Sequence, residues 1–282
     1  MPLDHLINTF NHRFIEENHL DSPPFDFRGG QVFGRFGDLT FTSDFRPIRQ
    51  LIRPDEIRAH ETTPLIFSPA NFSRGNNRSD PDSVKSSIVS LDRLSRTVHM
   101  LNYLLLDFSE GTLFLHVHPE HILSVNSDHG AYFEEIIRAC GLPLRRIAIS
   151  LTLSITHLSQ LNLLLERLKN YRKRGYAIAV RFDGNATESL ISQLREHHLH
   201  RLAPDHVRFS IRLFTDGFVG RSGEKARQRL FSSLRQQDTQ VHLTEIETSD
   251  DFDLARELTA DYVEGRFLEE IAGSRQPLKR SA

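Results

Sequence analysis

Short apolar runs typical of β-strands recur along the chain from about residue 38, and helical spacings of apolar residues separate most of them. Alternation of strands and helices indicates βαβ units and a mostly parallel sheet, so the fold class is α/β. About eight strands in roughly 240 residues favour a TIM-like (β/α)8 barrel. The strand-like runs are Leu39–Phe45, Pro64–Phe67, Leu113–His118, Arg146–Leu151, Ala177–Phe182, His206–Ile211, Gln240–Thr244 and Asp261–Glu264.

Apolar residues at steps of three and four predict long amphipathic helices between these strands. One such stripe runs from Val84 to Leu105, and a second runs from Leu158 to Leu168. A third begins near Phe252, and Thr248 is spaced to cap its first turn. A doubly wound open sheet is the competing architecture, but no G-x-G-x-x-G follows the first strand.

The chain outside the repeating pattern divides into a short extension and a tail. Residues 1–20 predict a polar helix with one apolar stripe, and residues 21–37 predict a connector rich in Pro and Gly. We therefore expect an N-terminal extension over 1–37, a barrel over 38–271 and a C-terminal tail over 272–282. A second loose stretch runs from Ser68 to Asp82.

Composition removes several function classes. The 282 residues carry 35 Lys and Arg against 37 Asp and Glu, so neither a basic nucleic-acid-binding domain nor a polybasic membrane surface is indicated. The apolar runs are too short to cross a membrane. The single cysteine, Cys140, excludes an intrachain disulfide framework and any multi-cysteine metal site. We expect a cytoplasmic protein.

Function in a barrel lies at the C-terminal ends of the strands, so the motifs there carry the chemistry. Eight different segments at or near these strand ends follow one another along the chain. They are Arg46-Pro47-Ile48, Glu61-Thr62-Thr63, Leu115-His116-Val117-His118, Arg146 to Thr152, Gly175 to Gly184, Asp205 to Ser210, Thr244-Glu245-Ile246-Glu247-Thr248, and Asp261-Tyr262-Val263-Glu264-Gly265. Together they resemble the EAL domain, the cyclic di-GMP phosphodiesterase family, from about residue 38 to 271.

The resemblance implies hydrolysis of a phosphodiester by two divalent cations held by carboxylates, and it implies which positions hold them. This sequence departs from that pattern at most of those positions, so we expect no metal, no other cofactor and no catalysis. Glu61 is the retained metal-binding carboxylate and Glu247 keeps its family place. The other former active-site positions are His116, Ser150, Arg181, Phe182, Arg208, Ser210, Thr244 and Glu264.

Alternation of side chains along each strand predicts which of these positions face the barrel interior. Arg181, Ser150, Arg208 and Ser210 would face inward, while their apolar neighbours would face the helices. An arginine at the mouth places a permanent charge where a cation would bind. We therefore hypothesise an ion pair between Glu61 and Arg181.

Two functions follow from these departures. The first is a catalytically inactive protein, and the resemblance to degenerate EAL proteins implies a regulatory role through a protein partner in bacterial control of motility, biofilm formation or virulence. The alternative is a cyclic di-GMP receptor without hydrolysis, in which Arg46, Arg181 and Arg208 hold the nucleotide in place of a family arginine that is Leu65 here. An active cyclic di-GMP phosphodiesterase remains a further option, and the resemblance also makes a homodimer plausible.

Two other interpretations concern histidines. His116, His118 and His121 could ligate Zn²⁺ or Ni²⁺, but a solvated strand end explains them more simply. His116 and Glu61 could also act as acid and base for a different reaction, although nothing in the sequence aligns a nucleophile with them.

Overall fold

The computed structural model describes residues 2–67, 81–106, 111–124, 130–182, 202–217 and 220–273. The described strands are β1 (Phe25–Arg28), β2 (Gln31–Phe36), β3 (Leu39–Gln50), β4 (Arg53–Phe67), β5 (Thr112–His116), β6 (Ile147–Leu153), β7 (Ala177–Phe182), β8 (His206–Ser210), β9 (Gln240–Thr244) and β10 (Tyr262–Val263). The described α-helices are α1 (Leu3–Asn18), α2 (Pro81–Tyr103), α3 (Pro119–Ser124), α4 (Ala131–Ala139), α5 (Leu161–Lys173), α8 (Gly220–Arg235), α9 (Ser249–Glu257) and α10 (Arg266–Gly273). Three short helical turns add to them: η1 (Leu144–Arg146), η2 (Ile155–Gln160) and η4 (Leu213–Gly217).

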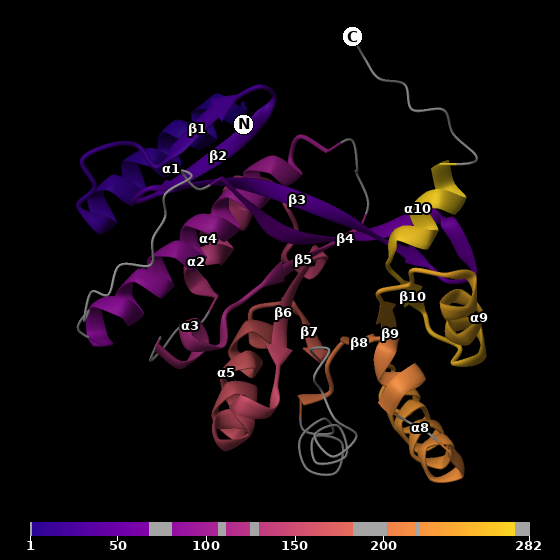
Figure 1. Ribbon diagram of the computed structural model, residues 1–282. Coiled ribbons are helices and arrows are strands. Elements are labelled where there is room, and N and C mark those ends of the chain that lie inside the picture. The colour runs from indigo at the N-terminus through magenta and orange to yellow at the C-terminus, as the bar shows by residue number, and fades with distance from the viewer. Residues whose placement is uncertain are drawn as a thin grey trace.

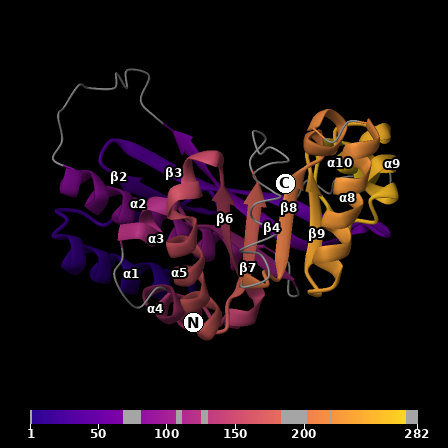
Figure 2. The ribbon, with the colours of Figure 1, turned by 90° about the horizontal axis from the view of Figure 1, so that it is seen from below.

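Strands β3 to β10 close into an eight-stranded barrel, which confirms the predicted fold class. The sheet order runs β3-β10-β9-β8-β7-β6-β5-β4, and β3 pairs with β4 to close the ring. The neighbours from β4 to β10 are parallel, whereas β3 is antiparallel to both β4 and β10. Helices surround the strands in both views (Figures 1 and 2).

The largest departure from the sequence prediction is the length of β4. We predicted a strand only over Pro64–Phe67, but β4 begins at Arg53 and forms a long antiparallel ribbon with β3. The first part of β4 was not predicted because its sequence is polar. The segment in the barrel carries Glu61, whose carboxylate faces inward, and the first residues of the strand are exposed or partly exposed. This ribbon extends beyond the barrel toward α1 and α2 (Figure 1).

The predicted connector over residues 21–37 is also wrong in part. It contains the hairpin β1–β2, which turns at Gly29 and Gly30, both with positive φ, and β2 continues the barrel sheet by pairing with β3. Phe25 and Val32 are buried beneath it, and Asn11 of α1 exchanges hydrogen bonds with the backbone of Phe25. The N-terminal segment is therefore integrated into the barrel sheet.

Side-chain alternation on the barrel strands is confirmed where it was predicted. Ile149, Val180 and Phe209 are buried in the layer between strands and helices. A separate, small apolar cluster fills the barrel interior, formed by Ile48, Ala59, Phe114, Ala148 and Ala179. The interior is thus packed, and its polar residues lie above and beside this cluster.

The predicted helices are present with small shifts at their ends. α2 ends at Tyr103, so Leu105 lies beyond it, and α5 begins at Leu161 after the turn η2. Thr248 caps α9 as predicted, with a reciprocal contact to Asp251. No helix in the described part of the chain is long and apolar enough to span a membrane. Residues 68–80, 183–201 and 274–282, which include most of the predicted loop and tail, lie outside the described residues.

Candidate functional site at the barrel mouth

Two arginines and two glutamates meet inside the barrel at the C-terminal ends of its strands. Arg208 on β8 donates from both terminal nitrogens to the two carboxylate oxygens of Glu61, at 2.6 and 2.9 Å, and to Glu264 at 2.5 Å. Arg181 on β7 donates to the same Glu61 oxygens at 2.9 and 3.2 Å. The hypothesised ion pair between Glu61 and Arg181 is therefore confirmed, and Arg208 extends it into a four-residue network, the mouth network.

Burial makes the mouth network electrostatically strong. The side chain of Arg208 is fully buried, and those of Glu61 and Glu264 are 4% and 10% exposed. Burial alone would raise the pKa of Glu61, but Arg208 and Arg181 outweigh it and hold that pKa at about 2. Burial raises the pKa of Glu264, because Arg208 offsets it only in part and the charge of Glu61 acts in the same direction as burial. The two guanidinium groups thus stabilise the ionised form of Glu61 at neutral pH.

A polar cleft of about 320 Å³ opens above this network, which we term the mouth cleft. Arg181 links the two, because it lines the cleft and contacts Glu61. Arg46, beside Glu61 across the β3–β4 pair, also lines it and lies 3.6 Å from Asp44. Arg208 does not line the cleft. The charged lining residues are Arg46, Arg49, Arg181, Arg266, Asp44, Glu245, Glu247, Glu264 and Glu269.

The remaining predicted positions lie around the mouth network, but their side chains have different partners and do not meet at one point. Ser150 is buried in the barrel, and its hydroxyl has no hydrogen-bond partner in the described structure. Ser210 donates to Glu245 at 2.7 Å, and Thr244 donates to the backbone oxygen of Phe209 at 3.3 Å. Phe182 instead faces the helix layer and stacks on Phe209, with ring centroids 5.0 Å apart. Phe182 therefore does not belong to the mouth.

Glu247 and His116 lie at opposite sides of the mouth. Glu247 is paired with the exposed Arg266 at 3.3 Å and also lines the mouth cleft. His116 ends β5 beside Ser150 on β6 and is exposed. His121, by contrast, lies 3.1 Å from Asp92, on the helix side. In the described ranges no group of three or more His, Cys, Asp or Glu side chains, these histidines included, is arranged to hold a metal.

Sequence reasoning missed a pair of histidines deeper in the barrel. His206 and His242 are hydrogen-bonded at 3.1 Å, and both rings pack against Phe114. Burial lowers the pKa of His206 to about 4 and that of His242 well below its ordinary value, so both are neutral. His206 shares the inward face of β8 with Arg208 and Ser210, and extending the alternation two residues back would have found it.

The family model of the EAL domain matches residues 40–270. The chain belongs to the EAL domain family. No curated protein matches it. The family assignment agrees with the closed barrel and with the resemblance carried by the strand-end motifs.

Solved EAL structures have the same fold at low sequence identity. Klebsiella pneumoniae BlrP1, in a calcium and cyclic di-GMP complex, gives a TM-score of 0.61 at 16% identity, covering 82% of this chain and 55% of that one. The Bacillus subtilis YkuI protein, with substrate cyclic di-GMP and calcium, gives 0.61 at 18% identity, covering 82% and 54%. The chain thus spans about half the length of these two. The Xanthomonas citri FimX EAL domain, in complex with cyclic di-GMP, gives 0.59 at 11% identity, covering 96% and 93%.

Residues at the mouth of this EAL domain do not fit a pair of divalent cations. Both carboxylate oxygens of Glu61 accept hydrogen bonds from guanidinium groups. These oxygens therefore already face positive charge and are occupied as acceptors. Arg181 and Arg208 cannot lose their protons to make room for a metal. Glu264, the other buried acid, contacts Arg208 as well. We therefore derive no metal-dependent step at this site.

Proposed function

We propose that this EAL domain does not hydrolyse cyclic di-GMP and acts as a regulatory protein that binds another protein in bacterial signalling. One observation carries the proposal: Arg208 and Arg181 both donate to Glu61, the acid at the family's metal-binding position. Two-metal hydrolysis needs acids free to hold cations and to activate a water molecule. Here the charge of Glu61 is already compensated inside the protein.

A metal titration tests the reason given for inactivity. The variant Arg181→Asp places a second carboxylate beside Glu61 but leaves Arg208 fully buried against it. We expect lower stability and no Mg²⁺ or Mn²⁺ binding by calorimetry, because Arg208 still fills the metal position. Restored binding of either cation in this variant would overturn the argument. Arg266→Asp, at an exposed position on the rim of the mouth cleft, is the matched control.

A cyclic di-GMP receptor without hydrolysis is the second candidate, and the mouth cleft favours it. Arg46 and Arg181 both line this cleft, and their guanidinium groups are partly exposed, with 52% and 26% of the side chain accessible. Two such groups suit a dinucleotide with two phosphates, because guanidinium forms paired hydrogen bonds to phosphate oxygens. Leu65, at the position of the family arginine, supplies no donor and is 49% exposed.

Calorimetry with cyclic di-GMP separates the two candidates. The receptor requires binding that Arg46→Ala weakens at least tenfold, while Arg58→Ala, on an exposed part of β4 outside the cleft, leaves it unchanged. No heat at high micromolar protein removes the receptor and leaves the regulatory protein. Hydrolysis of the nucleotide would contradict both.

A further inference from the structure

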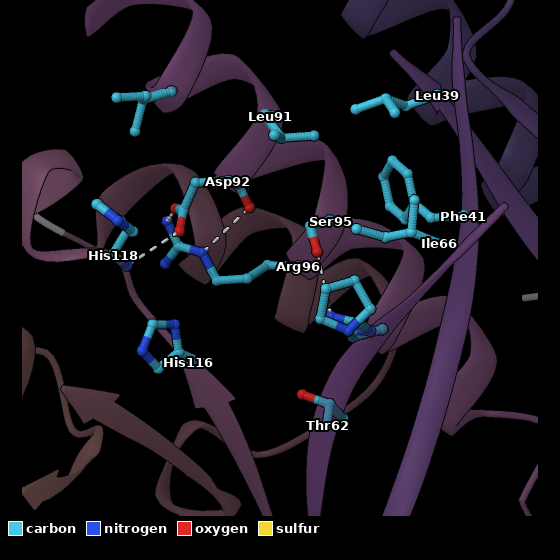
Figure 3. A pocket seen from close by; sticks show the side chains of 13 residues that line it. Leu39, Phe41, Thr62, Ile66, Leu91, Asp92, Ser95, Arg96, His116 and His118 are labelled. Atoms are coloured by element: carbon cyan, nitrogen blue, oxygen red, sulfur yellow. Dashed lines mark hydrogen bonds and ion pairs between the residues drawn. The ribbon is translucent and has the colours of Figure 1, made fainter. Parts of the chain in front are cut away.

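A second cavity, of about 350 Å³, lies outside the barrel between the β3–β4 ribbon and helix α2 (Figure 3). Its lining has no residue in common with the mouth cleft. Thr62 lines it, whereas the preceding Glu61 contacts Arg208 in the barrel, because successive side chains of a strand face opposite sides. The cavity is therefore distinct from the site of the mouth network, although His116 at the end of β5 borders both regions.

The two ends of this cavity differ in character. Figure 3 shows Leu39, Phe41, Ile66 and Leu91 gathered on one side, from both strands of the ribbon and from α2. Pro64 and Ile88 complete this apolar wall. The opposite end holds Asp92, Arg96, His116 and His118. An apolar wall with a few convergent polar groups is the usual form of a small-molecule site.

The buried acid and the buried base at the polar end are paired with each other. Asp92 and Arg96 form an ion pair in which the side chains are 9% and 1% exposed. His99 is held between the hydroxyls of Ser43 and Ser95, at 2.8 and 3.1 Å, and burial lowers its pKa to about 3. Asp92 and Arg96 thus compensate each other's charge, although Nη1 of Arg96 makes no hydrogen bond with the described residues. The imidazole of His99 is neutral at neutral pH.

His116 offers hydrogen-bonding capacity that is accessible from the cavity. The described residues form no hydrogen bond to its exposed ring. Desolvation lowers the pKa of His116, so the ring is neutral at pH 7.5. A neutral imidazole both donates and accepts. A head group that does the same, such as a hydroxyl, matches it.

We propose that this cavity binds a small uncharged amphiphile, with an aliphatic chain along the apolar wall and a hydroxyl or amide head at His116. A volume of about 350 Å³ takes roughly a dozen non-hydrogen atoms, given about 30 Å³ for each water in the liquid. A carboxylate head is disfavoured, because it would lose its hydration beside Asp92, and Arg96, the buried cation there, is already paired with that acid. The inference is independent of the proposed function, since it concerns a different cavity.

Calorimetry with 1-octanol and octanoate, on the full chain at pH 7.5, tests both the site and its preference. We expect 1-octanol to bind with one-to-one stoichiometry and octanoate to bind at least tenfold more weakly. Absence of 1-octanol binding would overturn the proposal. Equal binding of the two would overturn its charge argument, and with it the assigned head position.

Cavity-filling variants locate the binding. Leu91→Trp fills the cavity from α2. Ile66→Trp fills it from β4, at a residue that is 55% exposed and lies outside the buried core. Each is expected to weaken 1-octanol binding at least tenfold. Leu163→Trp, on α5 and 46% exposed, is the control that leaves binding unchanged. Equal binding by all three variants would show adsorption to the surface and refute the site.

Discussion

Removal of the buried Arg208 guanidinium is the sharpest test of the mouth network. In Arg208→Met, Glu61 and Glu264 remain buried while the group that contacts both is absent. Loss of one partner from a buried ion pair costs about 3–5 kcal/mol. The pKa of Glu61 gives a consistent magnitude, since lowering it from 4.5 to about 2 corresponds to about 3 kcal/mol at neutral pH. We therefore expect urea unfolding at pH 7 to show a loss of about 3–5 kcal/mol.

The pH dependence of this loss separates electrostatics from a packing defect. In the wild-type chain Glu61 has a lowered pKa, so its stabilisation is complete above about pH 4.5 and is lost as the pH falls toward 2. In the variant, Glu264 loses the arginine that offsets its burial, so its pKa rises further, while Glu61 keeps only Arg181 and its pKa rises from its wild-type value. Both acids therefore destabilise the fold most at high pH, when they are ionised. The difference in unfolding free energy between the two proteins should therefore shrink as the pH falls from 7 to 5.

Two control variants show whether the loss of stability in Arg208→Met comes from the buried charge. Arg266→Met removes an exposed partner of Glu247, 70% accessible, and should cost less than about 1 kcal/mol. Arg208→Lys keeps a charge and should lose less than the Met variant, which covers the case where the latter does not fold. A loss that stays constant between pH 5 and 7, or one below about 1 kcal/mol, would refute the reasoning.

Three further predictions concern separate parts of the fold. Thr248→Ala removes the capping box of α9 and should cost about 1 kcal/mol in urea unfolding. Gly265→Ala should destabilise strongly, with a lower thermal midpoint, because a Cβ there would lie 2.2 Å from the backbone oxygen of Ile246. His206 has a pKa of about 4, so wild-type stability falls as the pH drops from 6.5 to 4, and His206→Leu should flatten that slope in acid unfolding curves.

Each of these has a matched comparison. Thr9→Ala removes only an exposed hydroxyl that donates to the backbone within α1, so a loss equal to that of Thr248→Ala would argue against capping. Gly29→Ala meets no neighbouring atom and carries only the strain of positive φ, so it should cost less than Gly265→Ala. An unchanged acid slope in His206→Leu would show that other groups set it.

Much of the fold was predictable because strand and helix periods are local properties. Alternation on β7 and β8 placed Arg181 and Arg208 inside the barrel while their apolar neighbours filled the outer layer. The hairpin β1–β2 was missed, although Phe25 and Val32 flank a Gly-Gly turn, because the prolines and glycines around them suggested a connector. The antiparallel direction of β3 depends on its partners and leaves no mark in its own sequence.

The site itself was predictable only as a set of candidates. Strand alternation showed that Arg208 faces inward, but its partners Glu61 and Glu264 are 147 and 56 residues away in sequence. Which acid meets which arginine depends on barrel closure and on the register of β4 against β5. Glu245, which accepts from Ser210, was not singled out, because its left-handed backbone turns it toward β8 only in the folded structure.

The central claim is that guanidinium groups take the place of the cations at this mouth, and cyclic di-GMP hydrolysis measures it most directly. The purified chain is incubated with the nucleotide and Mn²⁺ or Mg²⁺, and the linear product is followed by chromatography, beside an active EAL domain and a sample with EDTA. The account predicts no product above the EDTA sample. Linear product formation that requires the metal and scales with protein concentration would contradict it.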